Sequence, residues 1–488
     1  MILKELITSS GASLDSGSWE QEITGLAYDS RKVRAGDLFF ALPGLKSDGT
    51  SFAVQAVDAG AMAVVSQSSR PEGLKAAWVK VRNARETMGI AADTFFGRPS
   101  LDLPVVGITG TNGKTTISFL VQHLVAAAHH RCGLIGTVRY ETGTEVIEAP
   151  HTTPESVDVQ TLLGRMRDHG CRAAVMEVSS HGLDQHRVTG VRFKVGVFTN
   201  LTQDHLDYHG TMERYFASKK VLFDMVDEHQ GTIVFNRDDV YGQRLLKHRY
   251  EGATLISYGL GVGADLRAVD VRPEPRGTQF QLEWGKSGRK SLVRIPFFGK
   301  HNVYNALAAL GAAQGLELNL REAVAHLAES PQVPGRLELV PGGNGVRVFV
   351  DYAHTPDALE NVLRSLREIR PNRIITVFGC GGDRDASKRP LMGAAVSRLS
   401  DISILTSDNP RTENPEQILD GVAAGMSGVW RRIVDREEAI ATAIRAAHPG
   451  DIVLVAGKGH ETYQEINGVR HPFDDRKVAR RLIEEASR

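Results

Sequence analysis

A run of glycine, threonine and lysine between an apolar segment and a helical pattern carries the clearest chemical signal in the sequence. It reads Gly107-Ile-Thr-Gly-Thr-Asn-Gly-Lys-Thr-Thr116. Glycines let the backbone curl so that successive N–H groups point at phosphate oxygens, and the following helix adds its positive N-terminal end. Lys114 would reach the outer phosphates, and Thr115 or Thr116 would offer a hydroxyl to Mg²⁺. We expect an ATP site here, although Ile108 stands where the usual phosphate-loop pattern has its first glycine.

Polar residues that follow two apolar strands indicate a metal site next to this loop. Glu177 begins the polar stretch Glu177–Leu183, and His205 lies in Thr199–Gly210. Open parallel sheets bind ligands at such strand ends. Each residue alone is more often an ordinary strand-end or loop residue, but their joint position behind a phosphate loop favours a divalent cation. Carboxylate oxygen with a water-rich shell favours Mg²⁺.

The elements that position these residues alternate between strand and helix. Apolar runs at Leu103–Thr109, Arg172–Val178 and Phe193–Thr199 predict strands, and Lys114–Ala128 predicts a helix. Continuous apolar strands that alternate with helices are typical of a mostly parallel sheet covered on both faces. A further α/β unit follows, with strands expected at Val346–Asp351, Arg373–Phe378, Ile402–Thr406 and Asp451–Ala456.

Turn-rich segments divide the chain into three expected domains. Phe96–Ser100 and Pro331–Gly335 carry the glycine and proline that mark linkers. Residues 1–102 combine short strand-like runs with one helical stretch, Ser51–Ala59, and the length of 488 residues suits three domains. We therefore predict an α/β protein with domains at 1–102, 103–333 and 334–488.

Composition restricts the partners and the compartment. The 58 basic and 58 acidic side chains give a formal net charge of zero, which argues against nucleic-acid or anionic-membrane partners. The three cysteines, Cys132, Cys171 and Cys380, are scattered and lack metal-ligand spacing, so they suggest thiols in a reducing compartment. No signal peptide or membrane span is evident. These features favour a cytoplasmic protein that acts on small molecules, and we expect a monomer.

The motifs in order along the chain resemble those of the Mur ligase family. The resemblance covers essentially the whole chain and rests on Gly110–Thr116, His151–Pro154, Glu177–Leu183, Asp204–Asp207, Gly299–Asn302, Gly335-Arg336, Asp351–His354, Asp408–Arg411 and Gly457–Glu461. It implies an N-terminal domain that holds a UDP group, a central phosphate-loop ATPase domain and a C-terminal Rossmann-like domain that receives an amino acid.

The resemblance also assigns roles to individual residues. ATP would be bound by Gly110, Thr111, Asn112, Gly113, Lys114, Thr115, Thr116, Asn302, Arg336, Asp351 and His354. A UDP-linked muramoyl dipeptide would be bound by Ser30, Leu45, Lys46, Ser47, Thr152, Thr153, Ser179, Gln185 and Arg187. His151 stands where relatives often have asparagine.

A carbamoylated lysine is a further feature of the family, and it falls here on Lys219. Carbon dioxide adds to a neutral amine and converts a cation into an anion that can ligate Mg²⁺ together with Thr115, Glu177 and His205. A lysine whose pKa shifts easily on burial suits this chemistry. Lys220 lies about 100° further round the expected helix, so only one of the two lysines should face the site. Without the resemblance, either lysine would be interpreted as a solvated surface residue.

The segment Asp408-Asn-Pro-Arg411 suggests which amino acid is added. A planar guanidinium binds a carboxylate through a bidentate fork, and diaminopimelate differs from lysine mainly by a second carboxylate. The expected contacts of diaminopimelate are Arg384, Asp408, Asn409, Pro410, Arg411, Gly457 and Glu461. Taken alone, the tetrapeptide is a common Asx-Pro turn, and the family resemblance favours the selectivity loop.

The expected reaction is ATP-dependent addition of meso-diaminopimelate to UDP-N-acetylmuramoyl-L-alanyl-D-glutamate through an acyl phosphate. Lys114, Glu177, His205 and Lys219 would be the catalytic residues. The alternatives are a lysine-adding relative, a ligase that adds glutamate to folate, and a phosphate-loop switch protein that changes partners rather than joining substrates. The folate ligase should lack the N-terminal domain and the Asp408–Arg411 loop, and the switch needs no dipeptide segment.

Overall fold

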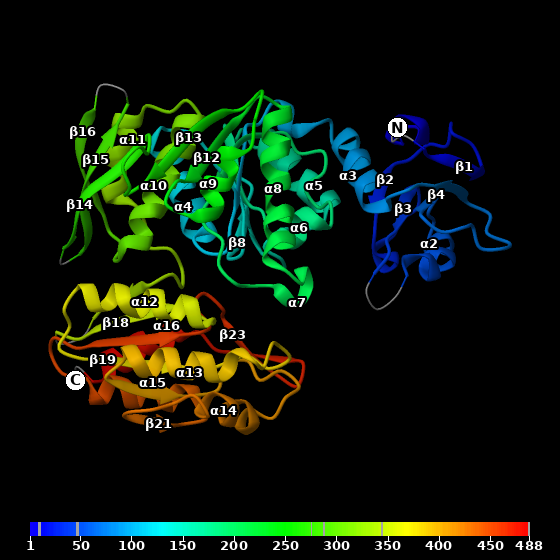
Figure 1. Cartoon of the computed structure of the whole chain (residues 1–488). Helices are drawn as coiled ribbons and strands as arrows, with labels where there is room; N and C mark the ends of the chain where they lie inside the picture. The colour runs from blue at the N-terminus through cyan, green and yellow to red at the C-terminus, as the bar shows by residue number, and fades with distance from the viewer. Residues whose placement is uncertain (8–10, 45–47, 275, 286–287, 343–344, 487–488) are drawn as a thin grey trace.

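Runs of apolar residues assemble into three separate sheets, and each sheet belongs to one of three α/β domains in this computed structural model (Figure 1). The structure describes residues 1–7, 11–44, 48–274, 276–285, 288–342 and 345–486. In Figure 1 the central domain lies between the N-terminal domain at the right and the C-terminal domain below. The expectations for Leu45, Lys46 and Ser47 fall outside the described residues.

The N-terminal sheet is a small, mostly parallel one. Its strands lie in the order β1 (Ser13–Ser16), β5 (Ala77–Lys80), β4 (Ala63–Ser66), β3 (Asp37–Ala41) and β2 (Gly25–Ala27). Only the β1–β5 pair is antiparallel. The helices are α1 (Leu3–Leu6), α2 (Ala53–Asp58) and α3 (Ala84–Phe95). The sequence predicted α2, whereas α3 was missed.

The central sheet has eleven strands, and its middle is parallel. The order is β16 (Arg289–Ile295), β15 (Gly277–Trp284), β14 (Leu266–Glu274), β13 (Thr254–Gly259), β12 (Thr232–Asn236), β11 (Phe193–Phe198), β6 (Val105–Thr109), β10 (Ala173–Glu177), β7 (Cys132–Ile135), β8 (Arg139–Glu141) and β9 (Val146–Glu148). From β14 across to β7 in this order, all neighbouring strands pair in parallel, and this part includes β6. Antiparallel strands extend both edges: β15 and β16 beyond β14, and β8 and β9 beyond β7. The carboxyl ends of β6, β10 and β11 therefore meet at one edge of the sheet.

Alternate side chains of the central strands enter two different cores. Val106 and Ile108 of β6 pack with α4 and α10, while Val105 packs with α5 and α8 on the other face. The helices of this domain are α4 (Lys114–Ala127), α5 (Ser156–Asp168), α6 (Ser180–Asp184), α7 (Leu206–His209), α8 (Met212–Glu228), α9 (Val240–Lys247), α10 (Lys300–Gly315) and α11 (Leu320–His326). The sheet is thus covered on both faces, as the apolar strand pattern predicted.

The C-terminal sheet has six strands, and all its neighbouring pairs except β17–β18 are parallel. Its order is β17 (Glu338–Val340), β18 (Arg347–Asp351), β22 (Ile452–Ala456), β19 (Ile374–Phe378), β20 (Ile402–Leu405) and β21 (Trp430–Arg432). The hairpin β23 (Tyr463–Ile466) and β24 (Val469–Pro472) stands apart. The helices are α12 (Pro356–Glu368), α13 (Lys388–Leu399), α14 (Pro415–Ala423), α15 (Arg436–Ala446) and α16 (Asp475–Ala486).

One phenylalanine ahead of α10 joins the central domain to the core of the C-terminal domain. Phe298 is buried in the cluster that contains Phe349 and Leu363, and its ring centroid lies 5.5 Å from that of Phe349. Gly299 follows with a positive φ of 87°, and a Cβ there would lie 2.3 Å from the hydroxyl of Ser365. The two domains therefore touch closely at this point, and only glycine fits it.

Within the part of the chain that the structure describes, no helix is both long enough and apolar enough to cross a membrane.

Candidate active site

The phosphate loop is folded around its own lysine. Gly110 has a φ of 143°, and a Cβ there would lie 1.8 Å from the Thr199 hydroxyl, so the position requires glycine. The Nζ of Lys114 donates to the carbonyl oxygens of Gly110 at 2.8 Å and of Thr111 at 2.9 Å. Burial lowers the pKa of Lys114. The amine thus occupies the centre of the loop, where the sequence motif predicts that phosphate oxygens bind.

A buried carboxylate lies directly beside the loop. Glu177, at the end of β10, is 1 % exposed, and its Oε2 accepts a hydrogen bond from the Thr115 hydroxyl at 2.9 Å. Thr137 donates to the same carboxylate from its backbone N–H at 2.8 Å and from its hydroxyl at 3.0 Å. These donors give both oxygens of the buried carboxylate hydrogen-bond partners. The strand-end residue predicted as a metal ligand is therefore next to the loop threonine.

The chemistry of Thr115 and Glu177 suits Mg²⁺, because a hydroxyl and a carboxylate supply the oxygen ligands that this ion prefers. A hydrogen bond of 2.9 Å joins the two side-chain oxygens, so they lie close to each other. The described residues hold no group of three or more His, Cys, Asp or Glu side chains placed for a metal. The remaining ligands would then be substrate oxygens, water or a modified side chain, which is usual for Mg²⁺.

Lys219 lies on the inner side of α8, against the same loop. It is 1 % exposed, its Nζ donates to the Gly110 carbonyl at 3.0 Å, and it lies 4.6 Å from the centre of the Tyr215 ring. Burial, followed by the charge of Lys114, lowers its pKa well below the usual value. The neighbouring Lys220 instead pairs with Asp224 at the surface. Only one of the two lysines faces the site, as the helical spacing predicted.

His205 stands at the mouth of the site in a loop. Its backbone is left-handed with a φ of 53°, and its ring centroid lies 4.9 Å from that of His181. Partial desolvation lowers the pKa of His205 to about 4, while 46 % of its side chain stays exposed. The imidazole is therefore neutral at physiological pH, which is the form that ligates metal ions.

The C-terminal domain reaches the phosphate loop through polar side chains. Arg336 donates from Nη2 to the Thr115 hydroxyl at 3.0 Å, and its guanidinium lies over the Tyr352 ring at 4.7 Å. Asp357, in the first turn of α12, accepts from Asn112 at 3.3 Å and from the Thr202 hydroxyl at 3.2 Å. The structure thus brings Arg336 and Asn112, two expected nucleotide contacts, to the same boundary.

Three other expected nucleotide contacts bond to the protein itself. Asn302 donates to the Phe298 carbonyl at 2.9 Å, and Asp351 accepts backbone N–H groups of Leu337 and Ala353 at 2.6 and 2.8 Å. His354 bonds through Nδ1 to the Tyr352 carbonyl at 2.8 Å. In this arrangement these side chains support the local backbone, and the structure gives them no direct link to the phosphate loop.

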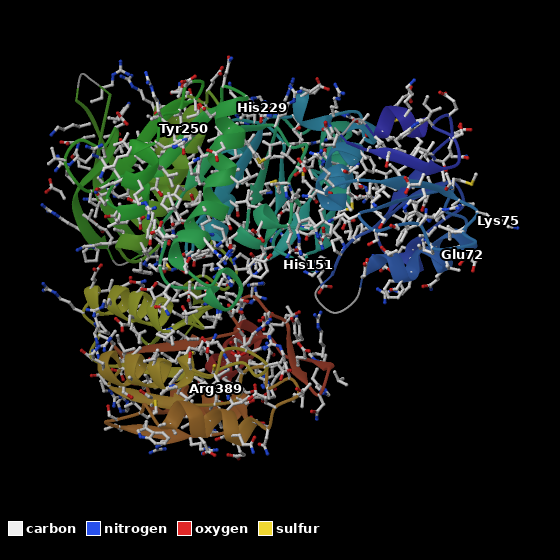
Figure 2. The ribbon with its side chains drawn as sticks, turned by 45° about the vertical axis from the view of Figure 1, so that its right-hand side comes forward. Glu72, Lys75, His151, His229, Tyr250 and Arg389 are labelled. Atoms are coloured by element: carbon white, nitrogen blue, oxygen red, sulfur yellow. The ribbon has the colours of Figure 1, made fainter. Side chains whose placement is uncertain are left out.

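The expected dipeptide contacts converge on the end of β10. The Thr153 hydroxyl donates to the Glu177 carbonyl at 2.9 Å and to the Ser179 hydroxyl at 3.1 Å, and Thr152 contacts Thr137 at 3.1 Å. Arg187 donates to the Thr153 carbonyl at 2.9 Å and to Gln185 at 2.8 Å. In Figure 2, His151 lies just before this segment at the lower edge of the central domain. Ser30 lies in the N-terminal domain, where it bonds to Gln55 at 3.0 Å.

A second polar cluster lies at the strand ends of the C-terminal sheet. Asn409 donates to Glu461 at 2.7 Å, and both accept from the Nζ of Lys458, at 2.8 and 3.1 Å respectively. Arg411 has a φ of 53° and donates to the Gly382 carbonyl at 2.6 Å. Arg384 is exposed.

Close packing explains the glycine at position 457. Its φ is 118°, and a Cβ there would lie only 2.3 Å from Oδ2 of Asp408. This Oδ2 is buried and accepts no hydrogen bond within the described residues. Asn409, Arg411, Gly457 and Glu461 are thus brought to one end of the C-terminal sheet, which is where open parallel sheets bind ligands.

Comparisons with known proteins identify the family. Three family models match, described as the Mur ligase family catalytic domain at residues 22–96, the Mur ligase middle domain at 108–313 and the Mur ligase glutamate ligase domain at 335–459. A curated UDP-N-acetylmuramoyl-L-alanyl-D-glutamate--2,6-diaminopimelate ligase from Geobacter metallireducens is 46 % identical, over 100 % of this chain and 99 % of its own length. The chain belongs to the Mur ligase family.

Solved structures agree with that assignment. A structure with the same ligase name as the Geobacter protein matches this Mur ligase with a TM-score of 0.73 and 35 % identity, over 100 % of this chain and 99 % of its own. The MurF ligase from Thermotoga maritima in complex with ADP, at 18 % identity, shares the fold with a TM-score of 0.63, over 95 % of this chain and 97 % of its own.

Two residues of this Mur ligase site were missed in the sequence. Thr137, in the connection after β7, makes two hydrogen bonds to Glu177, and nothing in its local sequence marks it. Lys458 is completely buried and joins Asn409 to Glu461. Its place within the family motif Gly457–Glu461 was the only available signal, because a lysine between two glycines is usually solvated.

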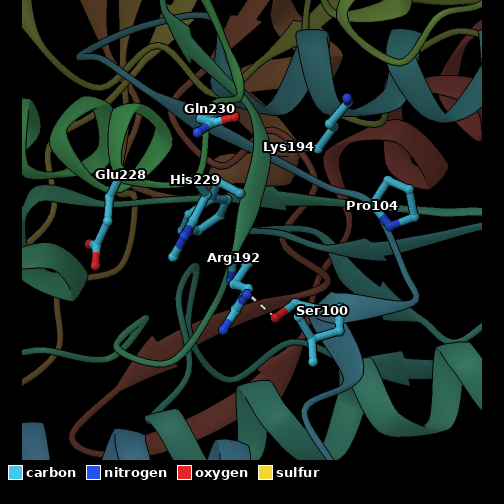
Figure 3. Close-up of a pocket in the computed structure, with 9 residues that line it drawn as sticks. Ser100, Pro104, Arg192, Lys194, Glu228, His229 and Gln230 are labelled. Atoms are coloured by element: carbon cyan, nitrogen blue, oxygen red, sulfur yellow. Dashed lines mark hydrogen bonds between the residues drawn. The ribbon is translucent and has the colours of Figure 1, made fainter. Parts of the chain in front are cut away.

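Two surface hollows lie away from these residues. One, of about 390 Å³, is lined by Ser100, Pro104, Arg192 and Glu228 at the opposite ends of the central strands (Figure 3). The other, of about 690 Å³, lies between β14 and the end of α12. Neither contains a residue of the phosphate loop.

Proposed function

We propose that this Mur ligase joins meso-diaminopimelate to the D-glutamate carboxylate of UDP-N-acetylmuramoyl-L-alanyl-D-glutamate, using ATP. The observation that carries the proposal is the full-length match, at 46 % identity, to a relative whose name states this pair of substrates. The site supports it, because a phosphate loop, a threonine-rich segment and an arginine-bearing loop lie at strand ends of neighbouring domains. We further propose that the domains run from 1 to 102, 103 to 333 and 334 to 488.

The phosphate loop would bind the ATP phosphates. Lys114 already lies at the centre of the loop, bonded to two backbone carbonyls, and would exchange them for phosphate oxygens. Arg336 contacts the loop from the opposite domain, so charge that develops on the transferred phosphoryl group would be stabilised from two sides. When bound, Mg²⁺ neutralises further charge there. We propose that it is held by Thr115, Glu177, His205 and the carbamate of Lys219.

The carbamate is consistent with the surroundings of Lys219. Carbon dioxide reacts with an unprotonated amine, and burial of Lys219 favours that form. The charge of Lys114 disfavours an ammonium at Lys219. The carbamate would be an anion, and Lys114 would attract it.

The dipeptide carboxylate would attack the γ-phosphate, giving an acyl phosphate and ADP. Thr152, Thr153, Ser179, Gln185 and Arg187 would hold the dipeptide beside the loop, and Ser30 with Leu45, Lys46 and Ser47 would hold the UDP group. The diaminopimelate amine would then attack the acyl carbon and expel phosphate. Bringing three substrates into one orientation contributes up to roughly 7–11 kcal/mol in favourable cases.

The far carboxylate of diaminopimelate would be bound by Arg411, with Arg384, Asp408, Asn409 and Pro410 around it. Glu461 and Gly457 would face the amino-acid end. Arg411 has a carbonyl and, at 3.7 Å, the carboxylate of Glu465 as its neighbours. A guanidinium in this place would repel the cationic end of lysine, which favours diaminopimelate over lysine.

The three cysteines are free and buried, which fits a reducing cytoplasm and a protein that needs no disulfides. We also propose that the enzyme acts there as a monomer on small-molecule substrates.

A coupled assay of ADP release tests the proposal. Purified protein receives ATP, Mg²⁺, bicarbonate and the UDP-dipeptide, together with diaminopimelate, lysine or glutamate in separate reactions. We expect multiple-turnover release only with diaminopimelate, because without an amino acid the reaction should stop after one ADP per enzyme, and we expect a product mass equal to that of the tripeptide. Multiple-turnover release with lysine would reassign the acceptor, and multiple-turnover release without any amino acid would remove the ligase proposal.

A further inference from the structure

Glu155 connects two arginines that come from different domains. It precedes α5, and its Oε2 accepts a hydrogen bond from Nη1 of Arg85 at 2.9 Å. Its Oε1 lies 3.2 Å from Nε of Arg187 and forms an ion pair with it. Arg85 belongs to α3 of the N-terminal domain, whereas Arg187 follows α6 in the central domain. The side chain of Glu155 is 14 % exposed, so this bridge is largely shielded from water.

The contacts around Arg187 fix the plane of its guanidinium. Nη1 donates to the Thr153 carbonyl at 2.9 Å and Nη2 donates to Gln185 at 2.8 Å, whereas Nε lies 3.2 Å from Glu155 as an ion pair and makes no hydrogen bond to any described residue. A guanidinium is planar with five N–H groups, so the two hydrogen bonds and the ion pair together define its orientation and leave one N–H on each terminal nitrogen. Two such N–H groups form the fork that binds a carboxylate.

Helix capping does not account for the position of Glu155. It occupies the N-cap of α5 with an extended backbone, yet its side chain makes no capping hydrogen bond. An acidic residue at this position would normally accept an N–H of the first turn. The carboxylate instead turns toward the two arginines.

We propose that Glu155 is a positioning residue, which holds the Arg187 guanidinium in the orientation that binds a carboxylate of the UDP-linked dipeptide. Through Arg85, it also couples this orientation to the position of the N-terminal domain. This inference rests on the proposed function. Glu155 itself does not touch the substrate. Without it, Arg187 loses its ion-pair partner and faces the positive charge of Arg85, so only its two hydrogen bonds are left to hold the guanidinium in place.

Calorimetric titration with two ligands tests the proposal, because UDP alone does not carry the dipeptide carboxylate. We expect Glu155→Ala to weaken binding of UDP-N-acetylmuramoyl-L-alanyl-D-glutamate by about ten-fold, the size typical of losing one partner of a partly shielded charge pair. Glu155→Gln, which keeps one acceptor oxygen, should fall between wild type and Glu155→Ala. Binding of UDP and the KM for ATP should stay within about two-fold of wild type in both variants.

Tyr28→Phe provides the matched control at the same domain boundary. The Tyr28 hydroxyl donates to Asp158 at 2.5 Å and does not contact Arg187, so its loss should leave dipeptide affinity unchanged. Arg85→Ala should weaken dipeptide binding, and the Arg85→Ala/Glu155→Ala pair should be no weaker than Glu155→Ala alone, because both changes break one chain of contacts.

The outcomes separate the alternatives. Equal losses of UDP and dipeptide affinity in Glu155→Ala would overturn the proposal and indicate a purely structural role. Unchanged dipeptide affinity would also overturn it. Failure of the wild-type protein to bind the dipeptide, while it binds UDP, would instead contradict the proposed function.

Discussion

Arg336 donates a hydrogen bond of 3.0 Å from its guanidinium to the hydroxyl of Thr115, across the boundary between two domains. The same hydroxyl donates to Glu177 at 2.9 Å. One threonine therefore connects a carboxylate of the central domain with a cation of the C-terminal domain, at the place where the nucleotide phosphates are expected. This contact from a second domain forms only when both domains are in place.

Replacing Arg336 should impair use of ATP. We expect Arg336→Ala to lower kcat/KM for ATP by roughly ten-fold to a hundred-fold, since hydrogen bonds to charged groups contribute about 1.5–3 kcal/mol. Affinity for the UDP-dipeptide, measured without ATP, should not change. Arg364→Ala removes an exposed arginine of the same domain, paired with Glu360 at 3.6 Å, and should leave both quantities unchanged. A normal kcat/KM in Arg336→Ala would contradict this role.

Lys219 and Lys220 offer a matched pair for testing the carbamate. Lys219→Met should abolish turnover and the carbamate resonance seen by NMR with ¹³C-bicarbonate, whereas Lys220→Met should retain both. Folding also makes a prediction, because burial lowers the pKa of Lys219 and so penalises its charged form in the folded state. In buffer free of carbon dioxide at pH 7, Lys219→Met should therefore have a higher Tm than wild type. An unchanged carbamate signal in Lys219→Met would place the modification elsewhere.

Arg411 should determine which amino acid is accepted. Arg411→Ala should raise the KM for diaminopimelate by at least about ten-fold, the value of a lost charge-assisted pair, while ATP affinity survives. Steady-state kinetics with each substrate varied in turn would measure both quantities. Arg384→Ala tests the exposed neighbour in the same way. Unaltered kinetics in Arg411→Ala would remove the argument for diaminopimelate that depends on the Asp408–Arg411 loop.

Asp93 predicts a pH-dependent change in stability. Burial raises its pKa to about 6 from 3.8, and its Oδ1 has no hydrogen-bond partner. The folded state therefore holds the proton more tightly than the unfolded state, so stability is full below about pH 4 and falls as the pH rises through about 6. Asp93→Asn should raise the free energy of unfolding at pH 7.5 by about 1 kcal/mol, after allowance for partial exposure, and by less at pH 5. Denaturant titrations at the two pH values check this, and an equal gain at both would contradict it.

The parallel middle of each large sheet could be predicted because its strands are buried on both sides. Val105–Thr109 and Ile452–Ala456 are continuous apolar runs, and Phe193–Phe198 is interrupted only by the exposed Lys194. Each strand lies within one or two residues of the expected bounds. The antiparallel strands at the edges carry charged residues that face solvent, and their weaker pattern gave no clear boundary. Helix α3 was missed because its buried face consists mainly of alanine, glycine and threonine rather than large apolar residues.

The site could be predicted in part for a related reason. Phosphate loops have a local sequence signature, so Lys114 and Thr115 were found from their spacing. Glu177 follows a strand and could be placed at a sheet edge. Thr137 and Glu155 make their contacts with residues distant in sequence, and no local sequence pattern marks either residue. Lys219 became visible only through the family resemblance, since its burial depends on the packing of α8.

The packing of Phe298 into the neighbouring core gives the space between the central and C-terminal domains two unlike margins. At one margin the ring of Phe298 is buried among apolar side chains, and its removal would expose apolar surface to water. At the other, Arg336 bonds to Thr115, and Asp357 accepts hydrogen bonds from Asn112 and Thr202. Water can replace such hydrogen bonds at small net cost. A rotation of the two domains about the apolar contact of Phe298 is therefore the separation with the smallest free-energy cost. Nucleotide and product would enter and leave on the hydrogen-bonded side, while the Phe298 contact stays intact throughout the cycle.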